Sequence, residues 1–307
     1  MDDHAINEVT ELIAPKLQHS AFERIKRWVT SRDTNGYPIP TWSYGPPGGG
    51  KTHLAQQLAD DLKVSFIPQA FGPTTTDVRV IGFLNASLGT YVPGPAYEWM
   101  RSGGLWFMDE LDNCEPSALV SINSLLANDR IRFPNGETVV KHKDCYALAG
   151  ANTLGTGATA GFRRQSQDAA ARSRWAKVKL EYDEKLERAL SPVAEWVDYV
   201  IKVRAAVERL AKSNIWITPR DSIIGSAALK NGVPEIEVVD HLLAEFSNDA
   251  KTQIINECGI FFLNTNKPKP KPYVDIVQVN EGLESGSTTW NESISYHKVS
   301  KKIRQYE

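Results

Sequence analysis

The sequence carries its strongest pattern at Gly45-Pro46-Pro47-Gly48-Gly49-Gly50-Lys51-Thr52. It fits the pattern G-x-x-x-x-G-K-[ST] and stands between a β-rich segment, Thr41–Tyr44, and an apolar helical pattern over Lys51–Leu62. Glycines let the backbone curl so that its N–H groups point inward, and the positive end of the following helix adds to the attraction for phosphate. We therefore expect a phosphate-binding P-loop from Gly45 through His53. Lys51 would reach the β- and γ-phosphates, while the Thr52 hydroxyl would bind Mg²⁺.

Length and composition describe a globular chain. At ~150 residues per domain, the 307 residues correspond to about two domains. A hydrophobic share of 41% and a charged share of 23% exclude a disordered or collagen-like protein. No apolar run approaches the ~20 residues of a membrane span, and the start Met1-Asp2-Asp3-His4 does not resemble a signal peptide, so we expect a cytoplasmic protein without a membrane partner. Three widely separated cysteines support neither a disulfide framework nor a zinc site.

From Thr41 to about Tyr182, short apolar segments alternate with helical patterns. Helices are expected at Lys51–Leu62 and Pro116–Ala127. The candidate strands are Thr41–Tyr44, Val64–Pro68, Gly104–Met108, Cys145–Ala151 and Trp175–Glu181. Strand, helix and strand in repetition imply a parallel sheet covered by helices on both faces. We predict an α/β nucleotide-binding domain of the P-loop NTPase type over residues 37–183.

The remaining chain divides into three parts. Residues 1–36 carry two short helical patterns, one over residues 6–13 and one over residues 22–28. Residues 184–263 have a helical period only, which predicts a small all-helical domain with helices at about 193–210, 219–230, 234–245 and 249–257. Residues 264–307 begin with alternating lysine and proline and are expected to form an extended linker and a tail, in which Tyr273–Val279 is β-prone.

Two further apolar segments end in polar groups. The segment Leu105–Met108 runs into Asp109 and Glu110, and the segment Cys145–Ala151 runs into Asn152. Ligands of parallel sheets bind at the carboxyl ends of strands, so these groups belong beside the P-loop. Asp109 would complete the Mg²⁺ shell, and Glu110 would polarise a water for in-line attack on the γ-phosphate. The Asn152 amide would hydrogen-bond that water or the γ-phosphate.

The P-loop, the pair Asp109-Glu110 and Asn152, in this order, resemble the motifs of AAA+ ATPases. The run Tyr91–Gly104, with the sequence YVPGPAYEWMRSGG, is similar to the stretch before the acidic pair in the MoxR/CbbQ group, which is related to dynein-like and magnesium-chelatase ATPases. The segments 152–157 and 168–175 resemble further CbbQ-type segments. The resemblance covers about residues 40–260. It implies an AAA+ core followed by a helical lid domain, with ATP and Mg²⁺ as cofactors and Asn152 as the sensor-1 residue.

Two arginines also enter through the resemblance. Arg174 matches the arginine finger, which in such rings reaches the γ-phosphate of the neighbouring subunit. Trp175 stands where phenylalanine is usual, and Arg172 is an alternative finger. The segment Thr218-Pro219-Arg220-Asp221 has the form of a helix-capping box, and Arg220 matches the sensor-2 arginine of AAA+ lids. A cation in the first helical turn opposes the helix dipole, so Arg220 requires an anion, either ATP phosphate or a surface carboxylate.

For the partner, the resemblance implies a ring of identical subunits, usually a hexamer, whose loops grip a client during hydrolysis. The first hypothesis is a chaperone or motor that remodels a protein complex, typically together with a von Willebrand factor A protein. Residues 71–91 and 130–140 are the candidate client loops. The second of these is expected to be a β-hairpin, because Asn135-Gly136 is a turn sequence that links alternating strands.

Two alternatives stay open. In a DNA- or RNA-remodelling enzyme, Phe133 would stack on bases, beside the basic residues Arg130, Arg132, Lys141, His142 and Lys143. With 35 basic and 37 acidic residues the net charge is −2, which gives nucleic acid no general support. The other alternative is a slow nucleotide-dependent assembly switch that scarcely hydrolyses ATP.

Overall fold

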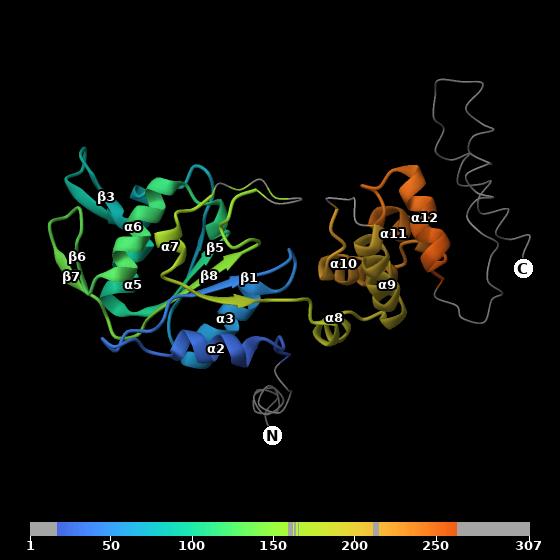
Figure 1. The fold of residues 1–307 in the computed structure, drawn as a ribbon, viewed down its shortest axis with the longest axis horizontal. Helices are drawn as coiled ribbons and strands as arrows, with labels where there is room; N and C mark the ends of the chain where they lie inside the picture. Colours follow the sequence, from blue (N-terminus) through green and yellow to red (C-terminus); the bar gives the residue numbers. More distant parts are fainter. Residues whose placement is uncertain (1–16, 159–161, 163, 165, 211–214, 263–307) are drawn as a thin grey trace, which may run out of the picture.

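The computed structural model describes residues 17–158, 162, 164, 166–210 and 215–262 (Figure 1). The helical pattern expected over residues 6–13 and the tail from residue 263, with its β-prone piece Tyr273–Val279, lie outside the described residues. Within the described part, no helix is both long enough and apolar enough to span a membrane.

A parallel sheet of five strands forms the centre of the nucleotide-binding region, which confirms the predicted α/β architecture. The strands are β1 (Thr41–Tyr44), β2 (Phe66–Ala70), β5 (Gly104–Asp109), β8 (Cys145–Ala151) and β9 (Ala176–Lys179). Their order across the sheet is β2-β5-β8-β1-β9, and all four neighbouring pairs are parallel. In the register, Asp109 of β5 pairs with Gly150 of β8, and Tyr44 of β1 pairs with Ala151. The three segments predicted to carry the chemistry therefore leave the sheet side by side.

Helices cover both faces of this sheet, as Figure 1 shows for α2 and α3 on one side and α5 and α6 on the other. Their bounds are α2 (Phe22–Thr30), α3 (Lys51–Leu62), α5 (Pro95–Ser102) and α6 (Pro116–Ala127). Successive side chains of a strand point to opposite faces of the sheet, so β5 contributes to the apolar core on each face. Leu105 and Phe107 pack with α2 and α3, whereas Trp106 and Met108 pack with α5 and α6. All four side chains are fully buried.

Among the described residues of this region, two small hairpins and three short helices accompany the sheet. The hairpins are β3 (Gly82–Asn85) with β4 (Thr90–Pro93) and β6 (Arg130–Arg132) with β7 (Thr138–Val140); the helices are α4 (Val78–Ile81), the 3₁₀ helix η1 (Leu111–Asn113) and α7 (Ala169–Arg172). The hairpin predicted over residues 130–140 is confirmed, with Gly136 at φ 85° in the turn.

In the part of the chain that the structure describes, five helices follow the sheet: α8 (Glu184–Leu190), α9 (Ala194–Leu210), α10 (Pro219–Lys230), α11 (Glu235–Leu242) and α12 (Asn248–Cys258), here together called the lid. They enclose an apolar cluster of their own, which includes the fully buried side chains of Val200, Val203 and Ile254. The cluster explains why this stretch has helical periodicity and no strand pattern.

Some boundaries differ from the sequence prediction. The strand expected at Val64 begins at Phe66, because Lys63 takes a left-handed conformation and the Val64 N–H bonds to the Ala59 carbonyl at the end of α3. The helix expected over residues 234–245 ends at Leu242, where the chain turns toward α12.

Candidate functional site

The P-loop leaves the carboxyl end of β1 and ends in the first turn of α3. Gly48 and Gly50 have φ angles of 71° and 77°, a left-handed conformation that side chains other than glycine rarely adopt. At Gly45, a Cβ atom would lie 2.1 Å from the Leu180 carbonyl oxygen, so only glycine allows the loop to pass this close to the backbone after β9. The sequence pattern thus corresponds to real steric requirements.

The Lys51 ammonium group lies inside the curve of the loop. Its Nζ donates hydrogen bonds to the carbonyl oxygens of Gly45, at 3.0 Å, and Pro46, at 2.9 Å, and to Oδ1 of Asn152, at 3.1 Å. Burial lowers the pKa of Lys51 to about 8, and the nearby carboxylate of Asp109 acts in the opposite direction. Burial removes water from the Lys51 ammonium group and so disfavours its charged form. An anion bound beside this group would restore the stability of the charged form.

Thr52 and Asp109 lie in direct contact. The Thr52 hydroxyl donates to Oδ2 of Asp109 at 3.1 Å, and Oδ1 of Asp109 accepts the backbone N–H of Glu110 at 3.0 Å. Glu110 has a φ of 54°, which turns the chain sharply after β5, and its side chain is exposed. A hydroxyl oxygen and one carboxylate fit Mg²⁺, which prefers oxygen ligands and commonly takes the rest from water and substrate phosphates. Among the described residues, no cluster of three or more His, Cys, Asp or Glu side chains could hold a metal alone.

Asp112 is a site residue that the sequence analysis missed. Its carboxylate is fully buried, and Oδ2 accepts hydrogen bonds from both the N–H and the hydroxyl of Thr153, each at 2.9 Å. Arg164 reaches the same oxygen with Nε at 3.2 Å, and its Nη2 lies 4.0 Å from Glu110. Asp112 therefore links two turns of the site: the turn after β8, which carries Asn152, and the turn after β5, which carries Glu110. The only sequence signal was a third acid three residues after Asp109, which alone predicts no contact with Thr153.

The lid contributes the N-terminus of α10. Thr218 is the N-cap; its hydroxyl accepts the Arg220 N–H at 3.2 Å, while the Asp221 carboxylate accepts the Thr218 N–H at 2.6 Å, so the predicted capping box is confirmed. This end of the helix touches the P-loop: a Cβ atom on Gly48 would lie 3.0 Å from Cβ of Thr218 and 3.6 Å from Cγ of Arg220. The exposed Arg220 side chain therefore starts beside the phosphate-binding backbone.

Three predicted residues do not join this cluster. Arg174 is exposed after α7, and its guanidinium donates to the Ala170 carbonyl. Arg172, the alternative, is half-buried. His53 is exposed on the first turn of α3. Of the two arginines, Arg174 is the one more accessible to another molecule.

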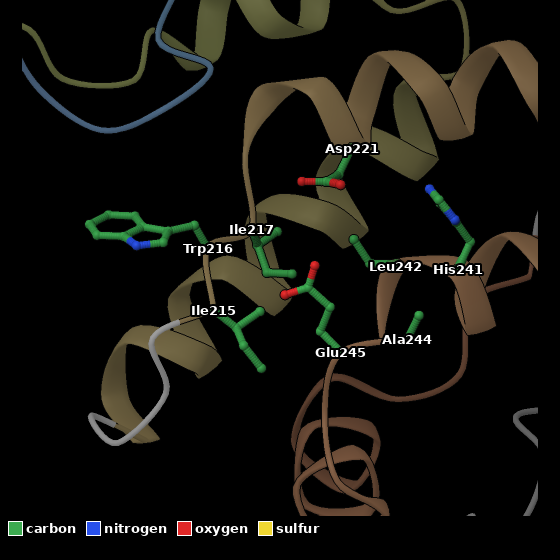
Figure 2. Close-up of a pocket in the computed structure, with 8 residues that line it drawn as sticks. All are labelled: Ile215, Trp216, Ile217, Asp221, His241, Leu242, Ala244 and Glu245. Atoms are coloured by element: carbon green, nitrogen blue, oxygen red, sulfur yellow. The ribbon is translucent and has the colours of Figure 1, made fainter. Parts of the chain in front are cut away.

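A hollow of about 160 Å³ lies in the lid, apart from the P-loop (Figure 2). Figure 2 shows the carboxylates of Asp221 and Glu245 directed toward its centre near Ile217, whereas the Trp216 indole points away. Two carboxylates would repel phosphate, and Asp221 is already engaged in the capping box. This hollow is therefore not the phosphate site.

The basic hairpin proposed for nucleic acid is partly structural. Phe133 is buried and packs edge-on against Tyr97, with ring centroids 5.1 Å apart. Lys141 is also buried, and its ammonium donates to the last carbonyls of α6, those of Leu125 and Leu126. The predictions that Phe133 stacks on bases and that Lys141 contacts nucleic acid are therefore wrong, because both side chains stabilise the core instead.

Comparison with protein-family models finds one match within this chain. Residues 44–175 match the family model described as the AAA domain (dynein-related subfamily), so this segment has the fold of an AAA+ P-loop NTPase. No curated protein matches the sequence significantly. Similar solved structures include a putative ATPase from Cytophaga hutchinsonii, with 17% identity, a TM-score of 0.44 and coverage of 82% of this chain and 72% of that chain. Another is the RuvB Holliday junction branch migration motor of Thermotoga maritima, with 16% identity, a TM-score of 0.41 and coverage of 83% and 69%.

Proposed function

We propose that this chain is a Mg²⁺-dependent ATP hydrolase that works as a ring and couples hydrolysis to the remodelling of a protein partner. One observation supports the proposal most strongly. Two hydrogen-bonded pairs, Lys51 with Asn152 and Thr52 with Asp109, lie side by side at the carboxyl ends of the adjacent strands β1, β5 and β8. A cation, a hydroxyl, a carboxylate and an amide placed around a glycine-rich loop are what phosphoryl transfer from a nucleotide requires.

Each side chain has a separate task in this reaction. The Lys51 ammonium exchanges its carbonyl acceptors for β- and γ-phosphate oxygens and offsets their charge. Thr52 and Asp109 would hold Mg²⁺, which when bound neutralises charge on the phosphates. Glu110 accepts a proton from the attacking water, and the Asn152 amide orients that water or the γ-phosphate. Arg220 approaches the phosphates from the lid.

The proposed ring of subunits gives Arg174 a role although it lies outside the cluster at the P-loop. An exposed guanidinium on the surface of one subunit can reach the γ-phosphate bound by the next, where such an arginine contributes ~10³-fold or more to the rate. The MoxR/CbbQ-like motifs in 91–104, 152–157 and 168–175 favour a hexamer and a protein client, with a von Willebrand factor A protein as the partner type.

The hairpin β3–β4 supports a protein client. Phe83, Leu84 and Leu88 are exposed there by 43%, 53% and 71%. Exposed apolar side chains gathered on one projection indicate contact with another protein. Phe71, at the start of the predicted client loop, is instead buried and does not face a client. Because Phe133 and Lys141 are buried, the structure does not favour the nucleic-acid alternative.

The test is phosphate release from ATP at several protein concentrations, with and without Mg²⁺. We expect turnover that rises more than linearly with protein concentration, because the site is completed between subunits. Lys51→Ala should abolish release, whereas Lys177→Ala, which removes an exposed lysine from β9, should not. Release that is equal in both variants would contradict the proposal. ATP-dependent assembly with negligible release by the unaltered protein would favour the assembly switch instead.

A further inference from the structure

The segment between β9 and α8 contacts the P-loop. Tyr182 lies three residues after the end of β9, and its hydroxyl donates a hydrogen bond to the carbonyl oxygen of Pro47 at 3.0 Å. Burial raises the pKa of the Tyr182 phenol well above its usual value, so the hydroxyl retains its proton and remains a donor. Pro47 stands next to Gly48, so this bond holds the part of the P-loop that faces the lid.

The ring of Tyr182 is held in turn by the lid. The guanidinium of Arg204, on α9, lies 4.5 Å from the centroid of the Tyr182 ring. Arg204 is buried and forms a bidentate ion pair with Glu187 of α8: Nη2 lies 2.7 Å from Oε1, and Nη1 lies 3.0 Å from Oε2. A buried, bidentate pair of this kind has a fixed geometry, because a guanidinium that lost its partner would remain uncompensated in the interior.

The same ion pair also fixes the start of α10. Arg204 donates through Nε to the carbonyl of Ile217 at 2.9 Å, directly before the N-cap residue Thr218. Glu187 accepts the hydroxyl of Ser222, in the first turns of α10, at 2.5 Å. One buried pair thus holds both the residue that binds the P-loop and the helix end that carries Arg220.

We propose that Tyr182, held by the Arg204–Glu187 pair, is a positioning residue for the nucleotide: it sets the separation between the P-loop and Arg220. In this scheme Lys51 binds the triphosphate from the P-loop and Arg220 binds it from the lid. The separation between the P-loop and Arg220 must therefore match the triphosphate. The inference rests on the proposed nucleotide site and adds a residue outside the P-loop that determines affinity. Tyr182 touches no reacting atom in this scheme and acts through Pro47 and the lid.

Tyr182→Phe tests this assignment, since it removes the donor and retains the ring beneath Arg204. The matched control is Tyr199→Phe, which removes a buried lid hydroxyl that has no hydrogen-bond partner among the described residues. The measurement is the affinity for a nonhydrolysable ATP analogue with Mg²⁺, together with the thermal unfolding midpoint of each variant without nucleotide. We expect Tyr182→Phe to weaken binding by about 3- to 10-fold, as for one lost hydrogen bond, and Tyr199→Phe to leave it unchanged.

A second comparison separates positioning from a structural role. If Tyr182 sets the gap spanned by Arg220, then Tyr182→Phe should have little further effect on affinity in an Arg220→Ala background. Effects that add fully would overturn the assignment, because the tyrosine would then act independently of the lid. Unchanged affinity in Tyr182→Phe, with normal binding by the unaltered protein, would also overturn it and leave the proposed function intact. If the unaltered protein binds no analogue, both proposals fail.

Discussion

Replacement of Gly48 by alanine should loosen the contact between the P-loop and the lid. Two costs follow from the structure. The φ of 71° places an alanine in the left-handed region, which costs ~1–2 kcal/mol. The new Cβ would lie 3.0 Å from Cβ and 3.3 Å from Oγ1 of Thr218, closer than the ~3.5–4.0 Å optimum for carbon atoms. Overpacking of this kind typically adds ~1–3 kcal/mol.

Gly232→Ala provides the matched control. Gly232 has a φ of 83°, and among the described residues, its two chain neighbours aside, no heavy atom lies within 4 Å of the position of its Cβ, so only the backbone cost applies. In urea unfolding without nucleotide, we therefore expect Gly48→Ala to lower the free energy of unfolding by at least about 1 kcal/mol more than Gly232→Ala.

A third variant isolates the contact itself. Thr218→Gly removes the opposing Cβ atom, and glycine at an N-cap costs only a few tenths of a kcal/mol. The combination of Gly48→Ala with Thr218→Gly should be more stable than the sum of the single changes predicts. Equal losses in Gly48→Ala and Gly232→Ala, or strict additivity in the double variant, would refute the contact between the P-loop and the N-terminus of α10.

Three further outcomes are expected. Arg174→Ala should bind ATP normally but lose hydrolysis, and mixing it with Lys51→Ala subunits should restore part of the activity if the arginine acts across subunits; normal turnover by Arg174→Ala would place the finger elsewhere. Asp112→Asn should lower the free energy of unfolding by about 3 kcal/mol, measured in urea, because Arg164 loses a buried counter-charge. Thr153→Val should cost less, ~2 kcal/mol, because its hydroxyl makes two hydrogen bonds, one to Asp112 and one from the Gly155 N–H. Burial lowers the pKa of His19, and its Nδ1 accepts the Ala21 N–H, so the unfolded chain binds a proton more readily than the folded chain. The free energy of unfolding should therefore fall as the pH drops below ~6.5. His19→Gln should reduce this pH dependence, measured by urea unfolding at several pH values.

The sequence alone predicted those parts of the fold that local residues determine. The helices Lys51–Leu62, Pro116–Ala127 and Pro219–Lys230 have the predicted ends, because glycine, proline and a capping box act within one turn. The cluster of Lys51, Thr52 and Asp109 with Asn152 was also predictable, since carboxyl ends of neighbouring parallel strands meet at one edge.

What the sequence did not predict depends on contacts between distant residues. Tyr182 and Pro47 are 135 positions apart, and nothing in the sequence around either residue indicates the hydrogen bond. Asp112 gains its partner Thr153 only when β5 and β8 pair. Phe133 and Lys141 matched a nucleic-acid pattern because an alternating hairpin shows which residues share a face, but not which face packs against α5 and α6.

ATP hydrolysis by this site is best tested by the chemical state of the nucleotide that Glu110→Gln retains. The protein is incubated with Mg²⁺ and ATP, separated rapidly from free nucleotide, and the bound species is identified by chromatography. Because the substituted amide would keep the shape of the Glu110 side chain but accept no proton, we expect intact ATP, held at a stoichiometry that Lys51→Ala cannot reach. Bound ADP, or equal retention by Lys51→Ala, would contradict the assignment of Lys51 to phosphate binding and of Glu110 to water activation.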